Sequence, residues 1–293
     1  MFRLLLCRKI NALKQVQKVR KKMKVINLLN MKGGAAKTFS VVNMAYELWR
    51  RGCKVLLWDN DKQGNLSRAY KRYDAESIAP VSKILEGEWD DPKELIQNTD
   101  YDGIDIITAN MSLFGAACNL TGRGGTDIFQ RYKDFLMDGK EDKEDDSIYT
   151  KYDYCIIDNP PDMGINVINA LAVTDEVIVP VKIDEDSLEG LDIVAEQIGD
   201  AKAINPALTL KGVLITSYQN TDGESAGLEW LEKEYENTES IRYKKYPLLG
   251  VIRYSKKVAE NSFLRKPIYE YSPCCGAAQD YKRFVTEYTG KGR

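Results

Sequence analysis

Short apolar runs rich in β-branched residues alternate, from residue 24 onward, with stretches whose apolar positions recur at helical spacing. This alternation is typical of βα units, which build a parallel sheet flanked by helices. The pattern therefore predicts one α/β domain with a mostly parallel, twisted sheet. The runs that predict strands cover residues 24–30, 54–59, 104–108, 152–158, 176–181 and 211–217.

Three segments show the clearest helical pattern. Residues 38–51 carry apolar side chains along one face and are followed by Gly52, a residue typical of helix ends. A second helix is expected over residues 187–204. A third is expected to begin after Gly276 and to run to about residue 288.

Composition and charge narrow the classes of protein that fit. With 43% hydrophobic and 29% charged residues the chain reads as globular, and no apolar run approaches the roughly 20 residues of a membrane span. We therefore expect a cytoplasmic protein without integral membrane association. Histidine is absent and no two cysteines form a CxxC pair, which argues against a zinc site or a redox motif.

The net charge of −2 hides an uneven distribution. Residues 1–22 hold eight of the 42 basic residues and none of the 44 acidic ones, so residues 23–293 carry a net charge of −10. Any contact with nucleic acid must therefore come from a local basic patch. The acidic stretch 141–146 lacks an apolar face and is interpreted as a solvated loop.

We accordingly divide the chain into a basic N-terminal extension, residues 1–22, and a domain of residues 23–293. Two interpretations of the extension stay open. It is either a disordered leader, or a basic amphipathic helix that binds acidic lipid or DNA. The second interpretation depends on apolar side chains that fall near one helical face, namely Phe2, Leu6, Ile10 and Leu13.

Residues 32–38, with the sequence KGGAAKT, lie between the first predicted strand and the first predicted helix. Glycines let such a loop curl with its N–H groups turned inward, and the helix start adds a positive dipole end. Lys37 can reach the β- and γ-phosphates of a nucleotide, and the Thr38 hydroxyl can ligate Mg²⁺. The pattern predicts a nucleotide site, with an ordinary βα turn as the alternative.

Acidic residues follow two other predicted strands. Asp59 and Asp61 leave a strand end on the same side, although a surface turn with an Asx-type hydrogen bond would use the same residues. Asp158 ends four apolar residues and is expected to hold Mg²⁺ through its water shell. Asp162 is expected to cap the helix that follows.

Together these segments resemble the ParA/MinD ATPases. KGGAAKT resembles their deviant Walker A motif KGGxxK[ST], DNDKQGN is similar to DxDPQGN with Lys62 in place of proline, and the segment ending IIDNPP fits hhhhDxPP. Residues 175–192 and 249–271 are also similar to family segments, so that the resemblance covers about residues 24–290. It implies a P-loop NTPase domain that binds ATP and Mg²⁺.

The resemblance also implies roles for single residues. Lys32 would reach across an ATP-bound homodimer to the partner's nucleotide, Asp61 would orient or deprotonate the attacking water, and Asp59 would order the magnesium shell. Two positions depart from the family, because Ala36 replaces a glycine and Phe39 a common threonine. We expect Ala36 to be tolerated only at negative φ, with slow turnover as a consequence. The implied nucleotide contacts are Lys32, Gly33, Gly34, Ala35, Ala36, Lys37, Thr38 and Phe39.

The function implied is DNA partition of a plasmid, mobile element or chromosome. The ATP-bound dimer would bind nonspecific DNA on the nucleoid, and a ParB-like adaptor bound to a centromere would stimulate hydrolysis. The most basic stretch of the domain supplies the expected DNA contacts, although a solvated surface is the alternative. These residues are Arg242, Lys244, Lys245, Lys256, Lys257, Arg265 and Lys266.

Two other functions stay open at this point. One is a MinD-like ATPase that positions material on a membrane surface. It is disfavoured because the chain ends in TEYTGKGR, without the basic amphipathic helix of that family. The other is a metabolic or kinase relative with the same loop, such as a cobyrinate-type amidotransferase.

Overall fold

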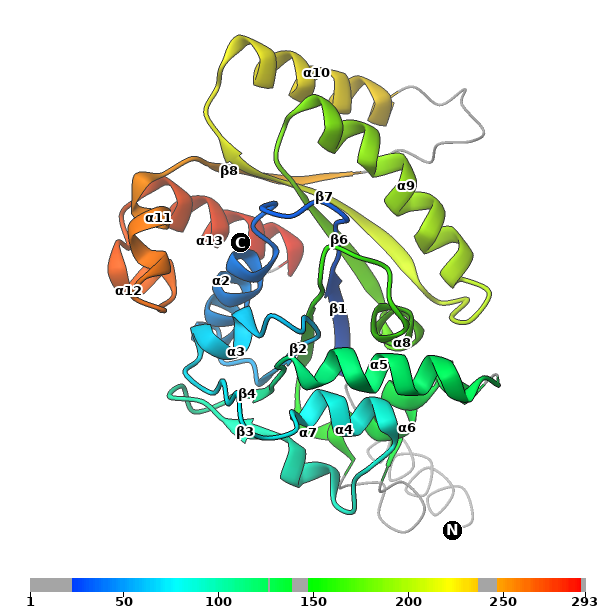
Figure 1. Ribbon diagram of the computed structural model, residues 1–293. Helices are drawn as coiled ribbons and strands as arrows, with labels where there is room; N and C mark the ends of the chain where they lie inside the picture. The colour runs from blue at the N-terminus through cyan, green and yellow to red at the C-terminus, as the bar shows by residue number, and fades with distance from the viewer. Residues whose placement is uncertain (1–22, 126, 139–146, 237–246, 291–293) are drawn as a thin grey trace, which may run out of the picture.

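Eight strands form one sheet in the computed structural model, which describes residues 23–125, 127–138, 147–236 and 247–290. The strand order is β3-β4-β2-β5-β1-β6-β7-β8, and every neighbouring pair is parallel except β3 with β4 (Figure 1). The strands are β1 (Lys24–Leu28), β2 (Val55–Asp59), β3 (Gln97–Asn98), β4 (Ile104–Ile107), β5 (Tyr154–Asp158), β6 (Glu176–Val181), β7 (Thr209–Tyr218) and β8 (Leu248–Arg253).

Helices cover both faces of the sheet. One face packs against α2 (Lys37–Arg50), α3 (Asn65–Ala69), α12 (Ile268–Tyr271) and α13 (Gly276–Tyr288), with α11 (Lys256–Ser262) beside α12. The other face packs against α4 (Pro80–Glu86), α5 (Ser112–Arg123), α6 (Arg131–Met137), α7 (Ile148–Lys151), α8 (Ile165–Val173), α9 (Glu185–Ala201) and α10 (Asp222–Glu236). Two short 3₁₀ turns, Pro92–Leu95 and Asp127–Phe129, complete the described elements.

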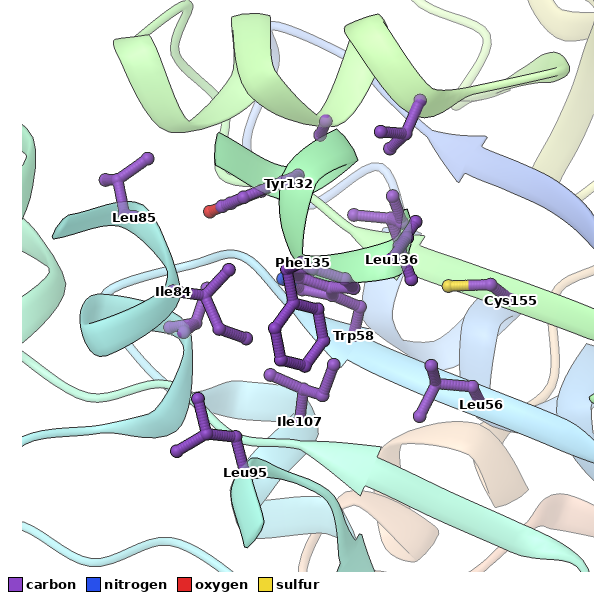
Figure 2. Packing of buried hydrophobic residues seen from close by; sticks show 14 of the residues in the cluster. Leu56, Trp58, Ile84, Leu85, Leu95, Ile107, Tyr132, Phe135, Leu136 and Cys155 are labelled. Carbon is purple, nitrogen blue, oxygen red and sulfur yellow. The ribbon is translucent and has the colours of Figure 1, made fainter. Parts of the chain in front are cut away.

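The strand period of two residues explains why the sheet has a core on each side. In β2, Leu56 and Trp58 join one apolar cluster while Val55 and Leu57 join the other. Figure 2 shows the first of these clusters, in which the Trp58 ring lies 4.6 Å from the ring centre of Tyr132. Aromatic contacts of this kind each add about 1 kcal/mol beyond the area they bury. They fix α6 against the sheet.

All six predicted strands are present, five of them with shifted ends and residues 176–181 with the ends predicted. The first ends at Leu28 instead of residue 30, and the last of the six extends over Thr209–Tyr218. The three predicted helices are also present, as α2, α9 and α13. The helix expected after Asp162 is α8, whereas the strands β3 and β8 and the other helices had no clear signal in the sequence. Across the described residues, no helix combines the length and the apolar character that a membrane span requires.

Parallel pairing brings three strand ends to one place. In the register of the sheet, Asp158 at the end of β5 lies between Leu28 at the end of β1 and Asp59 at the end of β2. The segments that follow β1, β2 and β5 therefore begin side by side. Ligand sites of open α/β sheets form at this edge, outside the carboxyl ends of the strands.

Candidate nucleotide-binding site

The loop between β1 and α2 turns through two left-handed residues. Gly34 has φ 77°, and Ala36 has φ 59° and ψ 29°. The loop thus holds Ala36 at a positive φ, and the expectation that alanine is tolerated there only at negative φ is wrong. Ala36 is the N-cap of α2, and its carbonyl accepts the Ser40 N–H at 2.9 Å, so that the helix start holds it in this conformation. For an alanine this costs about 1–2 kcal/mol.

The start of α2 has the features of an anion site. No side chain caps the helix, so its first N–H groups are available to a ligand. A Cβ placed on Gly33 or Gly34 would meet nothing within 4 Å, which shows that the space above the loop is open. A phosphate group can approach the backbone there.

Lys37 is buried beneath this loop. Its Nζ donates to the Asn30 carbonyl at 2.9 Å and to the Lys32 carbonyl at 3.2 Å. Burial lowers the pKa of Lys37, while the charges of Asp158, Asp61 and Asp162 act in the opposite direction. The Lys37 ammonium is therefore held in place by the carbonyl groups of Asn30 and Lys32.

The carboxyl group of Asp59 is fully buried and hydrogen-bonded within the chain. One oxygen accepts the Asp61 N–H at 3.2 Å, and the other accepts the Ser67 N–H at 2.8 Å and the Ser67 hydroxyl at 2.7 Å. Burial raises the pKa of Asp59 to about 7, against the effect of these bonds. Asp61 accepts the Gln63 N–H at 3.0 Å, so the Asx-type turn considered from the sequence is present. Such a bond leaves the second Asp61 oxygen available, and the catalytic role stays a prediction.

The side chain of Asp158 is a buried carboxylate whose hydrogen-bonding capacity is not satisfied within the protein. Its carboxylate is buried, and neither oxygen has a hydrogen-bond partner of normal geometry. Burial raises its pKa well above the usual range and nearby Asp59 adds to this, whereas the Thr38 hydroxyl and Lys37 lower it. A bound cation would supply the missing partner.

The carboxylates at this edge suit Mg²⁺ better than a metal ion that takes all its ligands from the protein. The charges of Asp158, Asp61 and Asp162 act on the buried Lys37 ammonium, and those of Asp59 and Asp61 act on Asp158. Within the described residues, no group of three His, Cys, Asp or Glu side chains forms a metal cage. Magnesium usually needs only one or two carboxylates, because phosphate oxygens and water complete its shell. The assignment of Thr38, Asp59 and Asp158 to this ion stays a prediction.

Lys32 lies at the rim of the same loop. Its Nζ forms an ion pair with Asp184 at 2.5 Å, and both side chains are more than a third exposed. Asp184 precedes α9, so the pair links the loop to the segment after β6. An exposed pair of this kind stabilises the fold by at most about 1 kcal/mol, and a competing anion can replace it.

A buried row of asparagines connects the strand ends, and the sequence motifs did not reveal it. The Asn60 amide donates to the Asn159 side-chain oxygen at 2.8 Å, and Asn159 in turn donates to the Asn27 side-chain oxygen. Asn60 also accepts the Tyr132 hydroxyl at 2.7 Å, and its carbonyl accepts the Asn166 amide at 2.9 Å. The only available signal was an asparagine after each of two strand-end aspartates. The row ties the segment of Asp59 and Asp61 to that of Asp158.

The expected helix cap by Asp162 is wrong, whereas the nucleotide contact of Phe39 stays a prediction. Asp162 does not cap α8, whose N-cap is Gly164 without a side-chain bond; it pairs instead with Lys62 at 3.2 Å. Lys62, the residue that replaces the family's proline, thus bridges the segments after β2 and β5. The Phe39 ring packs edge-on against Tyr281, with ring centres 5.8 Å apart, so that its side chain serves the contact of α2 with α13.

Four of the predicted DNA contacts lie close together in the chain. Lys256 and Lys257 begin α11, Arg265 and Lys266 precede α12, and all four are exposed. The predicted contacts Arg242, Lys244 and Lys245, together with the segments 1–22 and 141–146, lie outside the described residues.

Comparison with known proteins agrees with this geometry. Residues 23–210 match the AAA_31 family, described as an AAA domain. The chain is 31% identical over 270 residues to the sporulation initiation inhibitor protein Soj of Bacillus subtilis, which covers 92% of this chain and 99% of that protein. It is 30% identical over 270 residues to the chromosome-partitioning ATPase Soj of Thermus thermophilus, with 92% and 96% covered.

A solved structure extends the comparison to a ligand-bound protein. Cobyrinic acid a,c-diamide synthase from Mycobacterium smegmatis, with a bound ATP analog and magnesium, is similar at a TM-score of 0.70 and 27% identity. The similarity covers 92% of this chain and 97% of that one. The chain therefore belongs to the AAA_31 family and, through its likeness to the two Soj proteins, to the ParA/MinD superfamily of P-loop partition ATPases.

Proposed function

We propose that this protein is a DNA-partition ATPase, which binds Mg·ATP, dimerises around it, and coats nonspecific DNA until hydrolysis releases it. The observation that carries the proposal is the edge where β1, β5 and β2 end. There an uncapped helix start, a buried lysine and a buried carboxylate without a hydrogen bond of normal geometry lie at the same edge of the sheet. Each of these features fits a different part of a magnesium-bound triphosphate.

We assign a role to each functional residue at this edge. The first N–H groups of α2 and the Lys37 ammonium bind phosphate oxygens, and Thr38 and Asp158 hold the magnesium. Asp61 orients the attacking water, and Asp59 supports the metal shell and fixes the turn that carries Asp61. Bound Mg·ATP supplies the phosphoryl group that this water attacks.

In this proposal Lys32 binds the nucleotide of a second copy of the chain. Its present partner is the Asp184 carboxylate, and this exposed pair is weak enough to exchange for a phosphate of the partner's nucleotide. Dimerisation would then depend on ATP. Two basic surfaces would come together in one particle, which raises DNA affinity without any new contact within a subunit.

The cargo-bound partner is proposed to be a ParB-like adaptor that stimulates a slow hydrolysis. The relative from Thermus thermophilus is a chromosome-partitioning ATPase, which supports a role on chromosomes. Association with the nucleoid follows from nonspecific DNA binding and is part of the same proposal.

Four measurements on one variant set test the proposal: calorimetric Mg·ATP binding, light-scattering mass, ATP turnover, and binding to random-sequence DNA. We expect Lys37→Ala to lose nucleotide binding and Lys32→Ala to bind nucleotide as a monomer. Asp61→Ala is expected to bind ATP, to lose turnover by about 100-fold or more, and to stay on DNA as a dimer. Lys202→Ala, which removes an exposed lysine after α9, is the matched control.

The proposal fails if wild-type protein gives no binding heat with Mg·ATP, or if its mass stays that of one subunit. Normal turnover by Asp61→Ala would remove the catalytic assignment alone. Binding of the ATP form to anionic vesicles but not to DNA would replace partition by membrane positioning.

A further inference from the structure

The segment between α11 and α12 exposes two large apolar side chains next to each other. Phe263 is 88% exposed, the most of any large apolar residue in the described part of the chain, and Leu264 is 45% exposed. They are followed by Arg265 and Lys266. We refer to residues 263–266 as the tip. It lies at the periphery of the molecule, where α11 and α12 meet (Figure 1).

The tip is held in shape by a buried residue. The Asn261 carbonyl accepts the N–H groups of Leu264 at 3.0 Å and Arg265 at 3.2 Å, and its side chain donates to the Lys266 carbonyl at 2.6 Å. Arg265 is held at φ 51°, a left-handed conformation that arginine rarely adopts. Strained residues of this kind persist where the surrounding structure fixes them, and they gather at functional sites. The apolar pair is therefore presented by a preorganised turn.

The surface around the apolar pair is basic. Arg265 and Lys266 follow it directly, Lys256 and Lys257 begin the helix α11 that precedes it, and the α11 acid Glu260 bonds to Lys257 at 2.7 Å. Arg265 and Lys266 also line a cavity of about 280 Å³, together with Lys71 and the acidic residues Asp100 and Glu270. Because the domain as a whole is acidic, this local charge favours a polyanionic partner.

We propose that the tip inserts Phe263 and Leu264 between base pairs of duplex DNA, while Arg265, Lys266 and Lys256 hold the flanking phosphates. Proteins that bend DNA use apolar wedges framed by basic side chains in this way, without reading a sequence. The inference rests on the proposed function, and it adds a mode of DNA contact to the charge interactions expected from the sequence.

A membrane is the other polyanionic surface that an apolar and basic tip fits, and the size of the tip argues against it. A single myristoyl chain gives only marginal, reversible binding to a bilayer, and two side chains bury less apolar surface than that chain. In DNA, one inserted ring already contacts two base faces, and phosphate contacts add to it. Opening a base step costs a few kcal/mol of unstacking, and the phosphate contacts of the neighbouring basic side chains offset that cost.

The test compares Phe263→Ala and Leu264→Ala with wild type in the ATP state. Fluorescence anisotropy with a random-sequence duplex is expected to show roughly tenfold weaker binding for Phe263→Ala. The slope of affinity against salt is expected to stay unchanged, because no phosphate contact is lost. Arg265→Asn, which tolerates the left-handed conformation, is expected to lower that slope by about one. Ile78→Ala, which truncates an apolar side chain that is 53% exposed before α4, is the matched control.

A second readout reports the insertion itself. A duplex containing 2-aminopurine is expected to brighten with wild type and to stay quenched with Phe263→Ala at saturating protein. Unchanged DNA affinity and unstacking in Phe263→Ala, with wild type bound to DNA, would overturn this inference and leave the proposed function intact.

Three other results separate the remaining possibilities. Absence of DNA binding by wild type would overturn the proposed function itself. Loss of binding to phosphatidylserine vesicles, with DNA binding kept, would assign the tip to membranes. Loss of ATP-dependent dimerisation in Phe263→Ala would assign it to the contact between copies. Calorimetric Mg·ATP binding equal to wild type confirms that each variant is folded.

Discussion

Replacing Ala36 with glycine is expected to stabilise the nucleotide-free protein. Ala36 is held at φ 59°, where an L-residue other than glycine loses about 1–2 kcal/mol through contact of its Cβ with the following carbonyl. Glycine removes that contact, but it raises the entropy of the unfolded chain at a cost of about 0.4–1 kcal/mol. The net gain is therefore about 0.5–1 kcal/mol in the free energy of unfolding.

The neighbouring alanine provides a control in the same loop. Ala35 is buried, 3% exposed, and its φ is not positive. Ala35→Gly loses a buried methyl group and gains unfolded-state entropy, so that it is expected to destabilise by about 1.5 kcal/mol. Both substitutions replace alanine with glycine, but Ala36→Gly is expected to raise the free energy of unfolding and Ala35→Gly to lower it.

Equilibrium urea unfolding without nucleotide measures both effects. For Ala36→Gly we expect a higher midpoint with an unchanged slope, and a melting temperature higher by about 1–3 °C. A midpoint equal to or below that of wild type would refute the reasoning, because it would show that the loop adopts negative φ at this position in solution. Equal destabilisation by both substitutions would refute it in the same way.

Three further predictions concern the strand ends. Asn159→Leu is expected to lower the free energy of unfolding by about 2–3 kcal/mol, because Asn60 and Asn27 lose a buried partner; urea unfolding checks this. The raised pKa of Asp59, about 7, means that the folded state keeps a proton that the unfolded state releases near pH 4. The stability that this group contributes is therefore present at low pH and lost as pH rises from about 4 to 7. Asp59→Asn is expected to remove this decrease in the free energy of unfolding, which unfolding experiments across pH would measure. Finally, chelation of magnesium is expected to weaken ATP binding in wild type, and Asp158→Asn is expected to reduce that magnesium effect by about tenfold in calorimetry.

The local patterns of the chain were sufficient for the main secondary structure. Buried parallel strands are continuous apolar runs, so residues 54–59 and 176–181 were identified close to their observed ends. The helices α2 and α13 were identified because each buries one stripe of apolar side chains. The strand β8 and the short helix α11 were missed, since half-exposed edge elements have weak apolar patterns.

Conformations imposed by tertiary packing could not be predicted from the sequence. The left-handed φ of Ala36 depends on where α2 begins, and residue type alone argued against it. The role of Asp162 likewise depends on the distance between two loops that are far apart in the chain, since it pairs with Lys62 in place of the N–H groups of α8.

The sequence by itself determined that a glycine-rich loop precedes a helix and that acids end two strands, because these are features of neighbouring residues. Only the tertiary structure decided which strand ends meet. The parallel register places Asp158 beside Asp59 and beneath the loop, and the asparagine row joins their segments across gaps of about a hundred residues. That the Asp158 carboxylate is buried without a hydrogen bond of normal geometry is a property of that packing, since both depend on what the fold places around the group.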